Sequence, residues 1–205
     1  MMKKFREMSW QMYVIHLVMF VLGAIMTIIM IVHHNNPKLG GDPGLGVVIG
    51  AGLMGYLAVL PIFFLVLIVL VVVSNLFSYE PPPHPLVEIF VEEEKRSPAL
   101  IAYSVFLASI AGPFFEEVFF RGFCYPAFKK KWGMGWAMIL TAFFFALIHQ
   151  NLFAFFPIFI LGLCLCYLYE KRGTLVPSIV LHLTHNLVFI TYFFLAKKVL
   201  FGHGS

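Results

Sequence analysis

Two adjacent carboxylates and a guanidinium lie within residues 113–122, one of the most apolar stretches of this 205-residue chain. A charged side chain at the centre of a membrane helix costs about 2.5 to 3.5 kcal/mol. Glu116, Glu117 and Arg121 must therefore face protein or trapped water. On a helix, Glu117 and Arg121 are four residues apart with the acid first, which favours an ion pair. Glu116 points about 100° away around the helix axis, so it stays free for chemistry.

Two later apolar stretches carry further polar side chains. His149 follows Phe145 by four residues, and His182 precedes Asn186 by four residues, so each pair shares one helix face. Each residue alone is typical of an interior histidine or of an asparagine that joins helices. Together with the acidic pair they supply an acid, two imidazoles, an amide and an ion pair, all costly at membrane depth unless they face one another. We expect them to converge.

The composition indicates a multi-pass helical membrane protein. The chain is 61% hydrophobic and only 12% charged, its mean hydropathy is +0.92, and several apolar runs exceed the roughly 18 to 20 residues that cross a bilayer. Its net charge of +4 comes from small Lys/Arg clusters at the ends of apolar runs, an arrangement typical of membrane anchoring and not of nucleic-acid binding. We predict an all-α bundle with no nucleic-acid partner.

The apolar runs predict about six transmembrane helices. They cover residues 10–32, 44–77, 98–128, 135–152, 153–169 and 174–196, and a short interfacial helix precedes the third over residues 86–96. The second run is long, so Pro61 is expected to kink it; a hairpin there would give seven spans. Gly46, Gly50 and Gly55 predict close helix packing in this run. Lys and Arg are nearly balanced between the two faces, so they leave the orientation undecided.

Three motifs resemble, in order, the signature motifs of the CAAX protease and bacteriocin-processing (CPBP, or Abi) family of intramembrane endopeptidases. They are Glu116-Glu117-x-x-x-Arg121, Phe145-x-x-x-His149 and His182-x-x-x-Asn186. The resemblance implies a four-helix catalytic core over residues 98–198. Residues 1–97 would form a two-span extension with the interfacial segment.

The resemblance also implies roles for these residues. Glu116 with His149 would activate a water, and His182 and Asn186 would donate hydrogen bonds to the tetrahedral oxyanion. Glu117, Arg121 and Phe145 would support the site. The substrate would be a lipidated or hydrophobic protein or peptide, embedded in or tethered to the lipid bilayer. The chain would be a hydrolase and an integral protein of a prokaryotic cell membrane.

The sequence does not decide whether the site holds a metal cofactor. The family is named for metalloproteases, and Glu116, His149 and His182 would form a three-ligand zinc site with an open position for water. The chain has no His-Glu-x-x-His helix, and similar enzymes are described as using a glutamate-activated water without metal. The metal-free scheme is slightly favoured.

Other functions compete with hydrolysis. An aspartyl dyad is excluded because Asp42 is the sole aspartate. A proton-coupled transporter would use the same carboxylates and histidines as a relay, although the sequence has no visible inverted repeat. A non-catalytic immunity or binding protein would keep the same scaffold. Within the hydrolase hypothesis, His185 is three residues from His182 and is the alternative candidate for its role.

Overall fold

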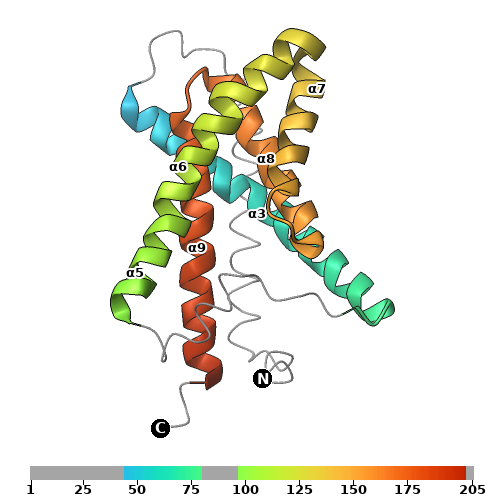
Figure 1. Ribbon diagram of the computed structural model, residues 1–205, viewed down its shortest axis with the longest axis vertical. Helices are drawn as coiled ribbons and strands as arrows, with labels where there is room; N and C mark the ends of the chain where they lie inside the picture. The colour runs from blue at the N-terminus through green and yellow to red at the C-terminus, as the bar shows by residue number, and fades with distance from the viewer. Residues whose placement is uncertain (1–43, 80–96, 202–205) are drawn as a thin grey trace.

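A computed structural model describes residues 44–79 and 97–201, and every regular element in these two ranges is a helix. The α-helices are α3 (Leu45–Leu76), α5 (Pro98–Phe106), α6 (Gly112–Glu117), α7 (Tyr125–Leu147), α8 (Leu152–Arg172) and α9 (Val176–Phe201). Two π-helical stretches join the early ones, η2 (Leu107–Ala111) and η3 (Val118–Cys124). The all-α prediction is confirmed for this part of the chain (Figure 1).

Four helices in the described ranges are long and apolar enough to cross a membrane. They are Leu45–Leu76, Pro98–Leu147, Leu152–Arg172 and Val176–Leu195. The predicted first span and the interfacial helix at residues 86–96 lie outside the described residues. The full count of six spans therefore stays a prediction.

The helical run Pro98–Leu147 is a long rod followed by a shorter one, and the chain reverses direction between them at Gly133. Ser97 caps its start by accepting a hydrogen bond from the N–H of Leu100 at 3.3 Å, and Pro98 occupies the first helical position. Gly133 interrupts the rod with φ 78° and ψ 173°, a backbone conformation that essentially only glycine adopts. In Figure 1 the chain rises through α5, α6 and the first turns of α7 and descends through the rest of α7. The predicted boundary between the third and fourth spans falls at this reversal.

Each π-helical stretch lies just before a proline. Pro113 follows η2 and Pro126 follows η3, each with one residue between. A proline ring clashes with the carbonyl four residues earlier in an α-helix. Widening the preceding turn to i→i−5 hydrogen bonds, as the N–H of Gly112 does to the carbonyl of Leu107, relieves that clash. The prolines thus change the local hydrogen-bond pattern of the helix without ending the helix.

Helix α3 is a single helix of 32 residues, so the hairpin alternative is wrong. Its glycine prediction is only partly correct. Added Cβ atoms at Gly52 and Gly55 would lie 2.6 Å from the carbonyl of Pro177 and 2.9 Å from Leu168, whereas Gly46 and Gly50 have no neighbour within 4 Å. The close approach of α3 to α8 and α9 therefore occurs at Gly52 and Gly55, whereas Gly46 and Gly50 face open space.

The chain also reverses between α8 and α9. Residues 170–172, which lie between the predicted fifth and sixth spans, remain helical, and Gly173 ends α8 in the left-handed conformation at φ 66°. Leucines and aromatic rings of α3, η3, α7, α8 and α9 then form one buried cluster, which includes Tyr56, Phe120, Phe145, Leu165 and Leu181. This cluster surrounds the polar groups described next.

Candidate active site

The buried centre of the site is the carboxylate of Glu117. Its Oε1 accepts hydrogen bonds from Nη1 of Arg121 at 2.8 Å and from Nδ1 of His182 at 2.9 Å. Glu117 and Arg121 are fully buried and His182 is nearly so. The helical spacing of four residues thus produces the predicted ion pair, and a long-range contact adds the histidine of α9. Because a carboxylate oxygen can only accept, Nδ1 of His182 carries the proton and Nε2 is left for other partners.

Glu116 faces that remaining nitrogen. Its Oε2 lies 3.7 Å from Nε2 of His182, and its side chain is 31% exposed, whereas that of Glu117 is completely buried. The 100° separation of the Glu116 and Glu117 side chains around the helix therefore directs them to different surroundings, as predicted. One carboxylate is enclosed within the bundle, and the other reaches its surface beside the same imidazole.

Arg121 is enclosed by α7 and α8. Its Nη2 donates to the carbonyl of Gly162 at 3.1 Å, and its guanidinium carbon lies 4.6 Å from the centre of the Phe145 ring. Gly162 lets α7 approach closely, because an added Cβ there would lie 2.9 Å from the backbone of Ala142. Ion pair, carbonyl and aromatic face together replace the hydration that a buried guanidinium loses.

His149 lies just beyond the end of α7, not within a helix as predicted. Leu147 is the last residue of α7, and Asn151 caps the next helix by accepting from the N–H of Ala154 at 3.0 Å. Nδ1 of His149 donates to the carbonyl of Phe145 at 2.7 Å. A carbonyl only accepts, so His149 also keeps its Nε2 for other partners.

The Phe145 ring joins the two histidines. It is completely buried, and its centre lies 5.0 Å from the ring of His149 and 5.5 Å from the ring of His182. This burial favours the packing role for Phe145 over a place in an open substrate groove. In the described part of the chain, His149 makes its hydrogen bond within its own segment and not with Glu116.

Asn186 lies one turn after His182 on α9 and binds the third-span helix. Its Nδ2 donates to the carbonyl of Ala108 at 2.8 Å. In the π-helical pattern of η2 this carbonyl would accept from the N–H of residue 113, but that residue is a proline and has no N–H. Pro113 thus leaves an acceptor that Asn186 fills, a link that a search of motif spacings does not reveal.

With this geometry in place, comparison with known proteins is informative. Residues 98–188 match the family model described as Rce1-like, type II CAAX prenyl endopeptidase Rce1-like. Over these residues the chain is similar to the CAAX protease family. All the motif residues lie inside the matched segment, and α3 lies outside it. Searches of curated proteins and of solved structures gave no match.

A three-ligand zinc site needs three side chains that meet at one point. Within the described residues, no group of three or more His, Cys, Asp or Glu side chains is arranged to hold a metal ion. Both histidines keep Nε2, so their hydrogen bonds do not oppose a metal. The arrangement of the three side chains does. The predicted ligand set of Glu116, His149 and His182 is therefore not assembled, and the residues do not fit a three-ligand zinc site.

His185 also departs from its predicted place in the site. It contacts the aromatic rings of Tyr56 and Phe63 on α3, at centroid distances of 5.9 and 5.2 Å. A separation of three residues from His182 turns it toward α3, and it cannot substitute for His182 at the carboxylates. Because α3 supplies both rings, the extension predicted for residues 1–97 packs directly against the helix that carries the site. The division into extension and core itself stays a prediction.

Proposed function

We propose that this chain is an intramembrane endopeptidase that hydrolyses a peptide bond in a membrane-associated protein or peptide. One observation carries the proposal. His182 lies between a buried carboxylate, Glu117, that fixes its orientation and a partly exposed carboxylate, Glu116, that can exchange protons. A carboxylate of this kind next to an oriented imidazole can act as a general base toward water. The CAAX-type family segment contains both residues.

The reaction begins with a water molecule held beside Glu116. As the water oxygen attacks the carbonyl carbon of the substrate, its proton moves to the carboxylate of Glu116. Negative charge develops on the former carbonyl oxygen. His182 in its protonated form donates Nε2–H to this oxyanion, and the buried carboxylate of Glu117 stabilises the imidazolium.

Two further residues complete the scheme. The amide of Asn186 has a second N–H besides the one given to Ala108, and this second N–H is the proposed companion donor to the oxyanion. His149 presents Nε2 near Phe145 and is the proposed partner for the attacking water. When the C–N bond breaks, the proton on Glu116 moves to the leaving nitrogen. This yields a carboxylic acid and an amine, between which the second water proton is then exchanged, and restores the enzyme.

Unpaired buried atoms support the presence of water in this region. Oε2 of Glu117 and Nε of Arg121 are buried and have no hydrogen-bond partner within the described part of the chain. Buried polar atoms of this kind are usually satisfied by ordered water. Both atoms belong to the pair that orients His182, so water there would lie next to the reacting groups.

The test is cleavage of a fluorogenic peptide in proteoliposomes. The first probe is a prenylated peptide with a C-terminal CAAX sequence, and the second is the same peptide without the prenyl group. We expect Glu116→Gln and His182→Gln to lower kcat at least a hundredfold. Thermal unfolding should show that Glu116→Gln remains folded.

His185→Gln is the matched control for His182→Gln, because it makes the same change on the same helix but faces α3. It should keep most of the activity. Full activity of Glu116→Gln would remove Glu116 from the proposed role. If neither peptide is cut, a comparison of new peptide termini in membranes with wild type and with Glu116→Gln decides whether the chain is a protease at all.

A further inference from the structure

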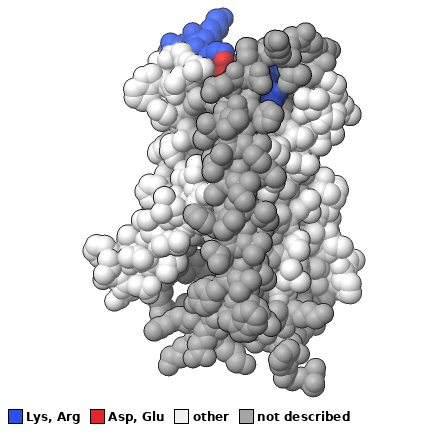
Figure 2. All heavy atoms as spheres, turned by 180° about the vertical axis from the view of Figure 1, so that it is seen from behind, with Lys and Arg blue, Asp and Glu red and all other residues white. Residues whose placement is uncertain are grey.

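Positive charge gathers at the end of the bundle where the rod reverses. Lys129, Lys130 and Lys131 lie just before Gly133, and Lys171 and Arg172 end α8. Figure 2 shows the described Lys and Arg side chains at this end, with the rest of the described surface on that side almost free of charge. Within the described residues, Glu170 is the carboxylate that pairs with one of these cations. We call these five residues the basic end.

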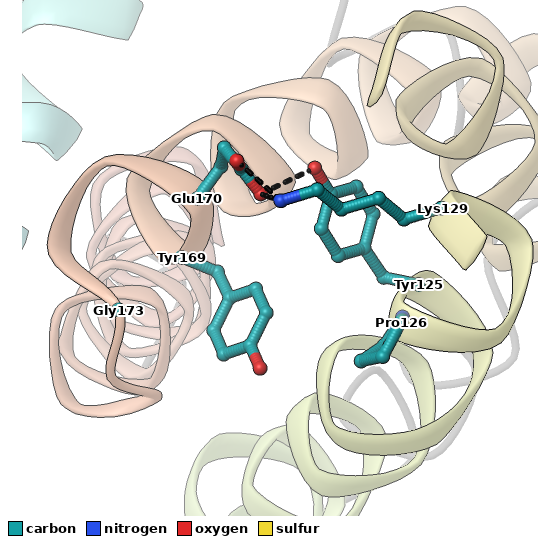
Figure 3. A pocket seen from close by; sticks show the side chains of 6 residues that line it. All are labelled: Tyr125, Pro126, Lys129, Tyr169, Glu170 and Gly173. Carbon is teal, nitrogen blue, oxygen red and sulfur yellow. Dashed lines mark hydrogen bonds and ion pairs between the residues drawn. The ribbon is translucent and has the colours of Figure 1, made fainter. Parts of the chain in front are cut away.

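A small pocket opens at the basic end, between the third-span rod and the last turn of α8 (Figure 3). Its volume is about 230 Å³, and it is lined by Tyr125, Pro126, Lys129, Tyr169, Glu170 and Gly173. Nζ of Lys129 lies 2.6 and 2.8 Å from the two oxygens of Glu170, and the hydroxyl of Tyr125 donates to the same carboxylate at 2.8 Å. The rings of Tyr125 and Tyr169 meet edge to face.

These contacts determine which charge the pocket can accept. A carboxylate beside two tyrosine rings would otherwise suit an amine, but Lys129 already occupies that position. The Glu170 charge is therefore neutralised inside the pocket. Lys130, Lys171 and Arg172 are exposed, and none pairs with a carboxylate in the described ranges. The remaining charge of the described residues at this end of the bundle is therefore positive, which favours an anion.

Aromatic residues place this opening at the level of lipid headgroups. Trp132 and Trp136 are 45% and 62% exposed in the same turn region, and Nζ of Lys131 lies 4.6 Å from the Trp132 ring. Tryptophan concentrates where the hydrocarbon core meets the headgroups. The basic end thus lies where a phosphate of the bilayer, and not a soluble anion, is present at high concentration.

We infer that the basic end binds the headgroup of an anionic phospholipid, with the phosphate at the opening of this pocket. The negative headgroup would contact Lys130, Lys171 and Arg172, and its apolar chains would follow the exposed faces of the neighbouring helices. Lipid-facing side chains of α7 such as Ile139 and Phe143 are exposed there. This inference does not depend on hydrolysis and would hold for a transporter as well.

The test measures lipid binding by native mass spectrometry of the purified chain. Phosphatidylglycerol and phosphatidylcholine with identical acyl chains are titrated at low ionic strength, and free glycerol phosphate is a third ligand. Each cation near a membrane surface contributes about a fivefold preference for an anionic lipid. We therefore expect Lys171→Gln/Arg172→Gln, and separately Lys130→Gln/Lys131→Gln, to reduce the preference for phosphatidylglycerol on the order of tenfold.

The matched control is Lys197→Gln/Lys198→Gln. It removes the same charge from the last part of α9, whereas the basic end lies next to the first turn of α9. It should keep the preference. An equal loss in this control, or no loss in the two basic-end variants, would overturn the inference. Tight binding of free glycerol phosphate would overturn the lipid assignment. If a variant fails to fold, the wild type is titrated with salt instead. A preference for phosphatidylglycerol that is the same at low and high salt would contradict an electrostatic headgroup site.

Discussion

Arg121 offers the sharpest test of how the site is held together. Replacing it with methionine keeps most of the volume and removes the charge, the bond to the Gly162 carbonyl and the contact over Phe145. Glu117 then remains as a fully buried carboxylate whose hydrogen-bond partner is His182. Removing one partner of a buried ion pair is more damaging than removing both, because the remaining charge has lost its water without compensation.

The expected loss follows from these contacts. Leaving one charge of a buried pair costs about 3 to 5 kcal/mol, and the aromatic contact adds about 0.5 to 2 kcal/mol. For a chain of this size, about 1 kcal/mol lowers Tm by roughly 2 to 4 °C. Arg121→Met should therefore lower Tm by more than about 6 °C. The double variant Glu117→Gln/Arg121→Met should be more stable than the single one, because no uncompensated charge remains.

The assay is thermal unfolding of the purified chain in detergent, followed by helix content. Arg172→Met provides the comparison, because the same change is made at an exposed position at the end of α8; its effect should stay within about 0.5 kcal/mol. Equal Tm values for Arg121→Met and Arg172→Met would refute the structural role of the buried pair. A double variant that is less stable than Arg121→Met would refute the charge argument while leaving the packing role.

Two further predictions use thermal unfolding as well. Gly162→Ala should destabilise the chain by about 1 to 3 kcal/mol through overpacking against α7, whereas Gly122→Ala, whose nearest neighbour would be 4.0 Å away, should not; equal effects would contradict the close approach. Asn186→Ala should cost about 0.5 to 1.5 kcal/mol, and adding Pro113→Ala should recover part of it because a new N–H can reach the Ala108 carbonyl. Failure of the second change to help would refute the explanation that Pro113 leaves the Ala108 carbonyl without a backbone donor.

Local spacing predicted the parts of this molecule that depend on one helix. The charge cost within residues 113–122 indicated that these side chains face inward, and the four-residue separation of Glu117 and Arg121 gave the ion pair directly. The cap at Ser97 was also predictable, because it depends on a serine followed by proline. These interactions form between residues three or four positions apart, so the local sequence is enough to predict them.

Long-range contacts were not predictable in the same way. His182 and His185 differ by three residues on α9, yet one binds Glu117 and the other lies against α3. Which histidine reaches the carboxylates depends on how α3 packs on α9. The spacing of residues within α9 gives no information on the position of α3. The place of His149 depended similarly on the helix end at Leu147, which the Asn151 cap and the left-handed backbone of Gln150 (φ 51°) define.

The π-helical stretches change how the surface of the rod must be mapped. A π turn holds more residues than an α turn, so every side chain after η2 is rotated relative to a uniform α-helix, and η3 adds a second rotation. A helical wheel drawn from Pro98 would place Phe115, Phe119 and Phe123 on the wrong side, although all three are among the most exposed side chains of the rod. Mutational scans of this segment should therefore show a tolerance pattern whose phase shifts twice, once near Ala111 and again near Cys124.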